Sequence, residues 1–216
     1  MTGKEFMKFE GAAVTYGTGA DKTQVLCPTD LSIAQGDFVA LVGPSGCGKS
    51  TILKLVLLLK PSEGHIFSGG RELGAYPVGV GIAFQSASLL QWMIVYDNVM
   101  LPLKIVPPFK VEFWTKRHGA FKDRIDALLE QVGLIDFADK SPWQLSGEMM
   151  QRANLYRASV HDPDLLLLDE PFGALDQFTR EELLQTLKTC CSIQNQPCCS
   201  SPKTCARPPI LLTAFV

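Results

Sequence analysis

The feature that most constrains this chain is a glycine-rich segment placed directly after an apolar run. Residues Phe38–Val42 are apolar throughout, as expected for a buried parallel strand, and residues 43–51 follow with the sequence GPSGCGKST. This segment matches G-x-x-x-x-G-K-[S/T], a loop whose backbone N–H groups turn into one concavity and bind an anion. Residues 51–60 predict a helix that ends before Pro61, and its positive end would strengthen the binding. The chain is therefore expected to hold phosphate at the end of a strand.

A second apolar run ends in two acidic residues. Residues 165–168 are four leucines that predict a buried strand, and Asp169 and Glu170 follow them. A carboxylate at a strand end suits Mg²⁺, while Lys49 is expected to reach the phosphates and the Ser50 hydroxyl to bind the same ion. Glu170 is a candidate base for an attacking water. Leucines followed by acids are more often a plain strand end, so this interpretation depends on the phosphate loop.

Composition narrows the class of protein. The chain has 216 residues, which corresponds to one domain with room for a small subdomain. Its 46% hydrophobic content and net charge of −2 argue against a general nucleic-acid binder and against an acidic disordered protein. No window of 18 consecutive apolar residues occurs, and the first residues lack the apolar stretch of a signal peptide. We therefore expect a soluble intracellular protein.

The order of predicted elements is that of an α/β protein. Alternating apolar and polar residues predict antiparallel strands in the first thirty-odd positions, and a helical block interrupted by prolines follows later. The predicted architecture is a P-loop α/β core with an antiparallel β-subdomain and a helical insertion at about residues 86–145. Further strands are predicted at 66–70 and 80–84, and further helices at 121–132, 146–160 and 180–188, with Pro102, Pro107 and Pro108 separating helical stretches.

The last part of the chain does not continue this pattern. Five of the seven cysteines fall at or after residue 190, and four of them form two adjacent pairs, a spacing that does not suit a zinc site. We expect no metal or redox role for them. We therefore divide the chain into a domain at 1–188 and an atypical Cys/Pro-rich tail at 189–216, in which 210–212 is a candidate strand. The tail is interpreted as truncated or altered, for instance by translation out of frame, which the encoding nucleotide sequence would test.

Further motifs carry a family resemblance. Residues 145–147 read Leu-Ser-Gly, and residues 171–176 read PFGALD directly after the acids. Together with the phosphate loop they resemble the ATP-binding subunits of ABC transporters, over about residues 6–188. Residues 84–92 and 161–183 look like the nitrate, sulfonate and taurine importer group. The resemblance implies an ABC-type ATPase fold, ATP and Mg²⁺ as ligands, and ATP hydrolysis that energises import of a small anion.

The resemblance also assigns roles to single residues. Tyr16 matches the aromatic residue that stacks on adenine, and Gln85 matches the glutamine that senses Mg²⁺ and the attacking water. Ser146 and Gly147 match the signature that caps the γ-phosphate bound by the other subunit, and Asp176 matches the aspartate that couples the two sites. The candidate residues are Glu170 and Gln85 for catalysis; Ser50, Gln85 and Asp169 for metal; and Tyr16, Gly43, Pro44, Ser45, Gly46, Cys47, Gly48, Lys49, Ser50, Thr51, Ser146, Gly147 and Asp176 for nucleotide binding.

The same resemblance implies the partners. Such subunits work as head-to-tail pairs, so a second copy of the chain is expected, together with transmembrane permease subunits. A periplasmic or extracellular solute-binding protein would act indirectly, and no nucleic acid is involved. The expected location is peripheral, on the cytoplasmic face of the inner membrane.

Two departures from the family pattern leave alternatives open. Glu148 stands where the signature usually has a second glycine, and a carboxylate there would repel phosphate unless it turns outward. The family also places a histidine after one more strand, whereas the histidines here are at 65, 118 and 161. These departures raise the alternative of a hydrolysis-impaired or vestigial ATP-binding module. A soluble nucleotide kinase is a further alternative, although it would not need the Leu-Ser-Gly motif.

Overall fold

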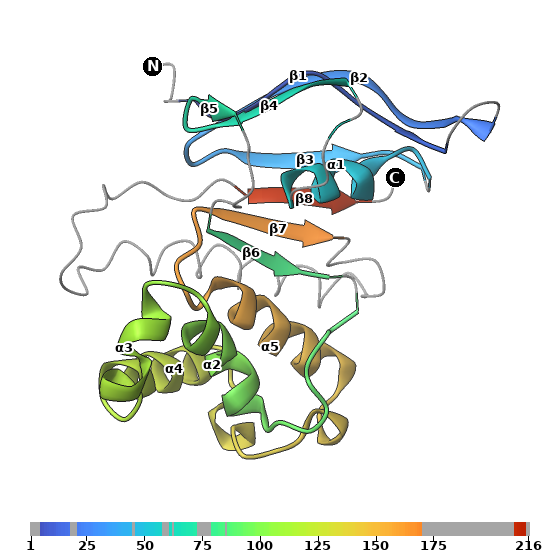
Figure 1. The fold of residues 1–216 in the computed structure, drawn as a ribbon. Helices are drawn as coiled ribbons and strands as arrows, with labels where there is room; N and C mark the ends of the chain where they lie inside the picture. Colours follow the sequence, from blue (N-terminus) through green and yellow to red (C-terminus); the bar gives the residue numbers. More distant parts are fainter. Residues whose placement is uncertain are drawn as a thin grey trace. The chain divides into compact units, whose positions relative to one another are not determined.

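A computed structural model describes residues 5–17, 21–44, 46–57, 61, 63–72, 79–84, 86–169 and 210–214, the last of these as backbone (Figure 1). The chain divides into two compact units. Among the described residues, the first unit contains those up to 80 together with 164–169 and 210–214, and the second contains 81–163.

The first unit contains an antiparallel sheet built from the start of the chain. Its strands are β1 (Glu5–Tyr16), β2 (Thr23–Ala34), β4 (Glu63–Ser68) and β5 (Arg71–Glu72), in the order β2-β1-β4-β5. The long β1 pairs with both β2 and β4, with register shifts on either side of Gly11, whose N–H donates to Asp30 Oδ1 over 2.7 Å. Met7, Phe9 and Ile33 are buried beneath this sheet. The predicted antiparallel subdomain is confirmed.

Three parallel strands lie beside one another in the same unit. Strand β8 (Ile210–Ala214) pairs in parallel with β3 (Phe38–Val42) and with β7 (Leu165–Asp169), so it lies between them (Figure 1). The register aligns Val42 with Ala214 and Thr213 with Asp169, which brings the carboxyl ends of all three strands to one edge. Ligands bind at this edge in open α/β sheets. The candidate strand at 210–212 is thus confirmed, and it joins β3 to β7.

Helix α1 (Lys49–Val56) follows the loop after β3. It buries Leu53, Leu55 and Val56 and contacts β2 and β7. Strand β6 (Val80–Ala83) then leads the chain out of the first unit into the second.

The second unit is helical, as predicted for the insertion. Its helices are α2 (Val95–Ile105), α3 (Phe109–Lys116), α4 (Ala120–Gln131) and α5 (Gly147–Ser159), with short 3₁₀ turns η2 (Ile135–Phe137) and η3 (Pro142–Gln144) before α5. Helix α2 contacts each of the other three. The buried core contains Val95, Val99, Leu103, Phe113, Phe121, Ile125, Leu129, Leu134 and Tyr156. None of the helices in the described ranges is both long and apolar enough to span a membrane.

Three predictions about individual elements are wrong, and two more concern residues that the structure does not describe. Strand β3 is parallel, but Phe38 and Val42 are 53% and 56% exposed, because a continuous apolar run does not ensure that both faces are covered. Helix α1 ends at Val56 rather than near 60, and Leu57 already has non-helical dihedral angles. Pro102 lies within α2 and does not break it, since Val106 N–H still bonds to the Pro102 carbonyl over 2.8 Å. The predicted helix at 180–188 and the boundary at 188/189 lie outside the described residues.

Candidate functional site

The loop between β3 and α1 needs glycine at two positions. Gly46 and Gly48 have φ angles of +80° and +98°, a left-handed conformation that side chains rarely adopt. A Cβ on Gly48 would also lie 3.2 Å from the Val25 carbonyl oxygen. The loop is closed by a hydrogen bond from the Cys47 N–H to the Pro44 carbonyl oxygen at 3.4 Å, and α1 begins two residues later, at Lys49. This turn places the N-terminal end of α1, with its partial positive charge, next to the loop.

Lys49 places its ammonium group inside the same loop. The side chain is 7% exposed, and Nζ donates to the carbonyl oxygens of Gly43 at 2.8 Å and Pro44 at 2.9 Å. The exposed thiol of Cys47 lies 4.0 Å from Nζ. A buried ammonium held by backbone oxygens, next to the N-terminal end of α1, makes a site with positive potential. That is the electrostatic requirement for binding a polyphosphate.

Ser50 and Asp169 are 119 residues apart in sequence and meet at the edge of the parallel strands. The Ser50 hydroxyl donates to Asp169 Oδ1 over 3.4 Å, near the upper limit of hydrogen-bond distance. Adjacent ligands of an octahedral Mg²⁺ lie about 3 Å apart, because each Mg–O distance is about 2.1 Å. A hydroxyl and a carboxylate at this separation therefore fit one Mg²⁺ without rearrangement of the backbone.

Tyr16 and Thr51 are the other candidate residues of the first unit that the structure describes. Tyr16 ends β1 and is 47% exposed, while Thr51 is buried in the first turn of α1. Ser45 and Glu170 lie outside the described residues, as do Gln85 and Asp176. The structure thus brings together the phosphate loop, Ser50 and Asp169, whereas the assigned roles of Tyr16, Glu170, Gln85 and Asp176 stay predictions.

Ser146 and Gly147 belong to the second unit, at the start of α5. Ser146 is the N-cap, and its Oγ accepts a hydrogen bond from the Met149 N–H over 3.2 Å. Both residues are exposed, and a Cβ on Gly147 would meet no atom within 4 Å. The start of α5 is therefore accessible to a ligand or a partner.

Glu148 does not stand alone in the first turn of α5. Its Oε1 forms an ion pair with Arg152 Nη2, one helical turn further on, and both side chains are half-buried. Arg152 Nη1 also donates to the Val132 carbonyl over 3.5 Å. The carboxylate is thus paired with a cation of the same helix, which offsets part of its negative charge.

Sequence reasoning missed three polar residues that hold the loop around residues 84–94. Asn98, fully buried in α2, binds the N–H of Leu90 and the carbonyl oxygens of Leu90, Met93 and Ile94 at 2.7–3.1 Å. Asn154 and Arg157, both in α5, bind Phe84 and Ser88. A polar residue at a core position of an amphipathic helix is the only sequence signal for such contacts.

Comparison with known proteins decides the family. The model of the ABC transporter family matches residues 26–173, which include the phosphate loop, the Leu-Ser-Gly motif and Asp169. The chain belongs to the ABC transporter family.

Relatives of this ABC protein are import subunits. It is 40% identical to the aliphatic sulfonates import ATP-binding protein SsuB of Bacillus licheniformis over 80% of this chain and 64% of that protein. It is also 40% identical to the taurine import ATP-binding protein TauB of Ruegeria pomeroyi over 74% of this chain and 57% of that protein. The chain thus spans about three fifths of the length of these curated relatives.

Solved structures agree on the fold. The dimeric structure of a post-hydrolysis state of the ATP-binding cassette MJ0796, bound to ADP and Pi, superposes with a TM-score of 0.73. That match is 26% identical and covers 96% of this chain and 87% of the other. The predicted ABC ATPase type of fold, with its antiparallel sheet and helical insertion, is therefore confirmed.

Proposed function

We propose that this chain is the ATP-binding and ATP-hydrolysing subunit of an ABC importer for a small anion such as nitrate, a sulfonate or taurine. Family membership supports the ATPase class, and the names of the sulfonate and taurine relatives support the solute class. The solute itself is selected by other subunits, so the proposal for this chain concerns ATP.

One observation carries the proposal. The ammonium of Lys49, the amides at the start of α1, the Ser50 hydroxyl and the Asp169 carboxylate converge at the carboxyl edge of β3, β8 and β7. Cationic and N–H groups suit the phosphates, and the two oxygens suit Mg²⁺. The set of donors therefore fits MgATP from its phosphate end.

The residues divide the chemistry between them. Loop amides and Lys49 would bind the β- and γ-phosphates, and Ser50 and Asp169 would hold Mg²⁺, which supplies charge neutralisation during phosphoryl transfer. Glu170, next in sequence to Asp169, would orient and deprotonate the attacking water, with Gln85 contributing to the same water and metal. Tyr16 would stack on the adenine ring.

The proposed assembly is a head-to-tail pair. Ser146 and Gly147 of one copy would cap the γ-phosphate held by the phosphate loop of the other, and Asp176 would couple the two sites. The dimeric structure of the similar cassette MJ0796 supports the pairing of two copies. Transmembrane permease subunits would dock on the pair at the cytoplasmic face of the membrane, and a solute-binding protein would act through them.

Nothing in the comparisons supports the hydrolysis-impaired alternative. One of its two grounds was repulsion by Glu148, and the ion pair with Arg152 weakens that ground. The other ground, the lack of a histidine beyond residue 161, concerns sequence alone.

Steady-state hydrolysis by the purified chain tests the proposal. We expect magnesium-dependent release of phosphate from ATP that is abolished in Glu170→Gln and in Lys49→Ala. Because Glu170→Gln removes only the base, it should still bind MgATP, whereas Lys49→Ala should not. The control is Lys54→Ala, which removes an exposed lysine of the same helix and should leave both properties unchanged. Equal turnover in wild type and Glu170→Gln would contradict the assigned base.

A further inference from the structure

Helix α3 turns one face toward the core of the second unit and another toward solvent. Phe113 is buried in that core, and Phe109 packs against it. Val111 and Trp114 lie three residues apart, so they share a face of the helix, and they are 84% and 67% exposed. Ile105, at the end of α2 just before this helix, is also exposed. Three large apolar side chains from neighbouring segments are thus open to solvent.

The same stretch of chain is basic. Residues 104–118 contain four lysine and arginine residues and one carboxylate, whereas the whole chain has a net charge of −2. The carboxylate, Glu112, forms an ion pair with Lys116 at 2.7 Å. Among the residues that the structure describes, no carboxylate pairs with the other three cations, which are Lys104, Lys110 and Arg117. Positive charge therefore surrounds the exposed apolar side chains.

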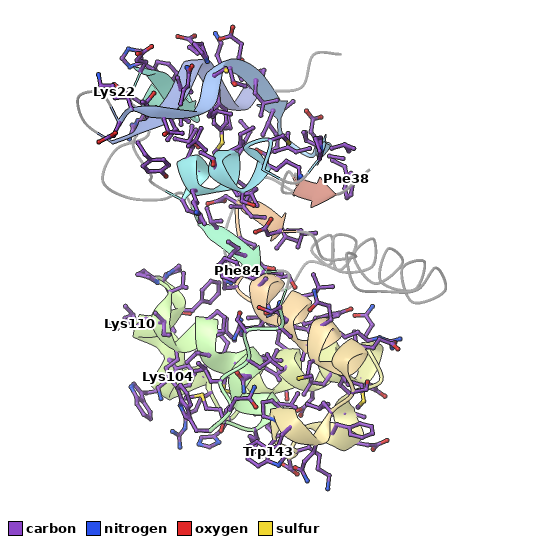
Figure 2. The ribbon with its side chains drawn as sticks, turned by 90° about the vertical axis from the view of Figure 1, so that its right-hand side faces the viewer. Lys22, Phe38, Phe84, Lys104, Lys110 and Trp143 are labelled. Carbon is purple, nitrogen blue, oxygen red and sulfur yellow. The ribbon has the colours of Figure 1, made fainter. Side chains whose placement is uncertain are left out.

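Cations and apolar groups are interleaved on this surface. Lys110 and Trp114 are four residues apart on α3, and the Arg117 guanidinium carbon lies 5.0 Å from the centre of the Trp114 ring. Figure 2 shows Lys104 and Lys110 on the same edge of the helical unit. The α3 patch is defined here by six residues, Ile105, Val111 and Trp114 with Lys104, Lys110 and Arg117.

The chemistry of the α3 patch favours a lipid surface over a protein partner. Lysine is depleted at protein–protein interfaces, whereas tryptophan flanked by lysine and arginine is typical of segments that lie at the surface of a membrane. The tryptophan ring is apolar with one polar N–H group, and the long stem of lysine lets its charge reach lipid phosphates. Anionic lipids supply the complementary charge.

We propose that the α3 patch binds the surface of a membrane that contains anionic lipids. Its apolar side chains enter the headgroup region, and its cations bind lipid phosphates. Because Phe113 anchors the helix in the core, the patch is fixed before it meets the lipid, which lowers the cost of binding. The inference goes beyond the proposed function, since it requires neither nucleotide nor permease subunits.

Co-sedimentation of the full chain with lipid vesicles, without nucleotide, tests the proposal. The probes are vesicles of phosphatidylcholine alone and vesicles of phosphatidylcholine mixed with phosphatidylglycerol, which is anionic. Trp114→Ala removes the aromatic ring of the patch. Its control is Trp143→Ala, because Trp143 is 68% exposed and lies at another end of the same unit (Figure 2).

A second pair of variants tests the charge of the patch. Lys104→Glu combined with Lys110→Glu reverses two charges within it. Lys22→Glu combined with Lys54→Glu gives the same net charge, but both of these exposed lysines belong to the first unit. The comparison therefore separates the local charge of the patch from the net charge of the chain.

We expect the wild type to bind anionic vesicles and not neutral ones, with an affinity that falls as salt is added. Trp114→Ala should weaken binding by about tenfold, as expected when one large apolar side chain is lost from the contact. The Lys104 and Lys110 reversal should weaken it by about 25-fold, since each basic residue near an anionic surface contributes about fivefold. Both controls should bind like the wild type.

Tryptophan fluorescence locates the contact directly. The chain has three tryptophans, so Trp92→Phe combined with Trp143→Phe leaves Trp114 as the emitter. Anionic vesicles with brominated acyl chains should quench this emission and shift it to shorter wavelength. A matched chain that keeps Trp143 in place of Trp114 should show neither change. This measurement also covers the case in which Trp114→Ala alters folding.

Several outcomes would overturn the inference. Equal binding to neutral and anionic vesicles, or an equal loss in the two charge-reversed chains, would exclude the patch cations as the cause. Absence of binding, unquenched Trp114, or binding only to vesicles that also contain permease subunits would refute lipid as the partner. Lys49→Ala should bind vesicles like the wild type, so a failure of the proposed ATP site would leave this inference standing.

Discussion

Arg152 is expected to protect the signature from the negative charge of Glu148. In the structure the Glu148 carboxylate pairs with Arg152 along α5, so removal of the arginine would free the carboxylate next to Gly147. The change to make is Arg152→Ala, and the property to follow is formation of the ATP-dependent dimer, in which the signature meets the γ-phosphate of the partner's nucleotide.

The magnitude follows from the electrostatics of a single charge. A carboxylate about 6 Å from a phosphate charge costs roughly 0.7 kcal/mol at the dielectric constant of water and roughly 3 kcal/mol at the effective value near a protein surface. The dimerisation constant should therefore fall by about 3-fold to about 150-fold for each site. Loss of the ion pair itself costs the fold only about 0.5 kcal/mol, because the pair is half-exposed and lies one turn apart on a helix.

Sedimentation in MgATP separates the charge effect from the packing of Arg152. Measurements in the Glu170→Gln background avoid turnover of ATP. In that background, Arg152→Ala is compared with Glu148→Gln and with the double variant that carries both changes. We expect Arg152→Ala to weaken dimerisation strongly when Glu148 is present and little when it is replaced by glutamine. An equal loss in both backgrounds, or no loss in either, would refute the electrostatic reasoning.

Three further results are expected from the first unit. Alkylation of the exposed Cys47 thiol, which lies 4.0 Å from Lys49 Nζ, should block MgATP binding as measured by calorimetry. The same treatment should leave MgATP binding by a Cys47→Ser variant unchanged. Unchanged binding by the wild type after complete alkylation would contradict the site. The hydrogen bond that the His65 ring donates to Glu72, followed by the charge of Glu72, raises the pKa of His65 above 6.5. The pair therefore stabilises the fold fully below pH 6.5 and progressively less as pH rises through the raised pKa. NMR titration should show that Glu72→Gln returns the pKa of His65 toward 6.5, and an unchanged pKa would exclude this cause. Both Gly11 and Gly64 have positive φ, but only a Cβ on Gly64 would clash, because it would lie 2.3 Å from the Gly11 carbonyl oxygen. Gly64→Ala should therefore lower the free energy of unfolding by more than the roughly 1 kcal/mol expected for Gly11→Ala. Equal midpoints of chemical denaturation for the two variants would disprove the clash.

Local features of the sequence predicted much of the fold. The phosphate loop, the strand before it and the helical insertion all depend on nearby residues, and each is present in the structure. The prediction that β3 is buried was wrong, because the exposure of Phe38 and Val42 depends on which elements cover the sheet. An apolar run carries no information about that cover. The ABC ATPase architecture itself came from the combination of motifs rather than from any single periodicity.

Contacts between distant residues were the part that sequence could not supply. Strand β8 is a short run within an atypical segment, and only its pairing with β3 and β7 reveals that it lies in the middle of the parallel strands. The bonds from Arg157 to Ser88 join residues 69 positions apart, which no local pattern predicts. The pairing of Glu148 with Arg152, by contrast, follows the i, i+4 spacing of a helix and is a local feature of the sequence.

Calorimetric titration of the chain with MgATP tests the central claim most directly. The account predicts saturable binding of one nucleotide per chain, lost in Lys49→Ala, weakened in Asp169→Asn only when Mg²⁺ is present, and unchanged in Lys54→Ala. Absence of binding by the wild type, or equal affinity in Lys49→Ala, would contradict the claim that this loop holds the phosphates of ATP.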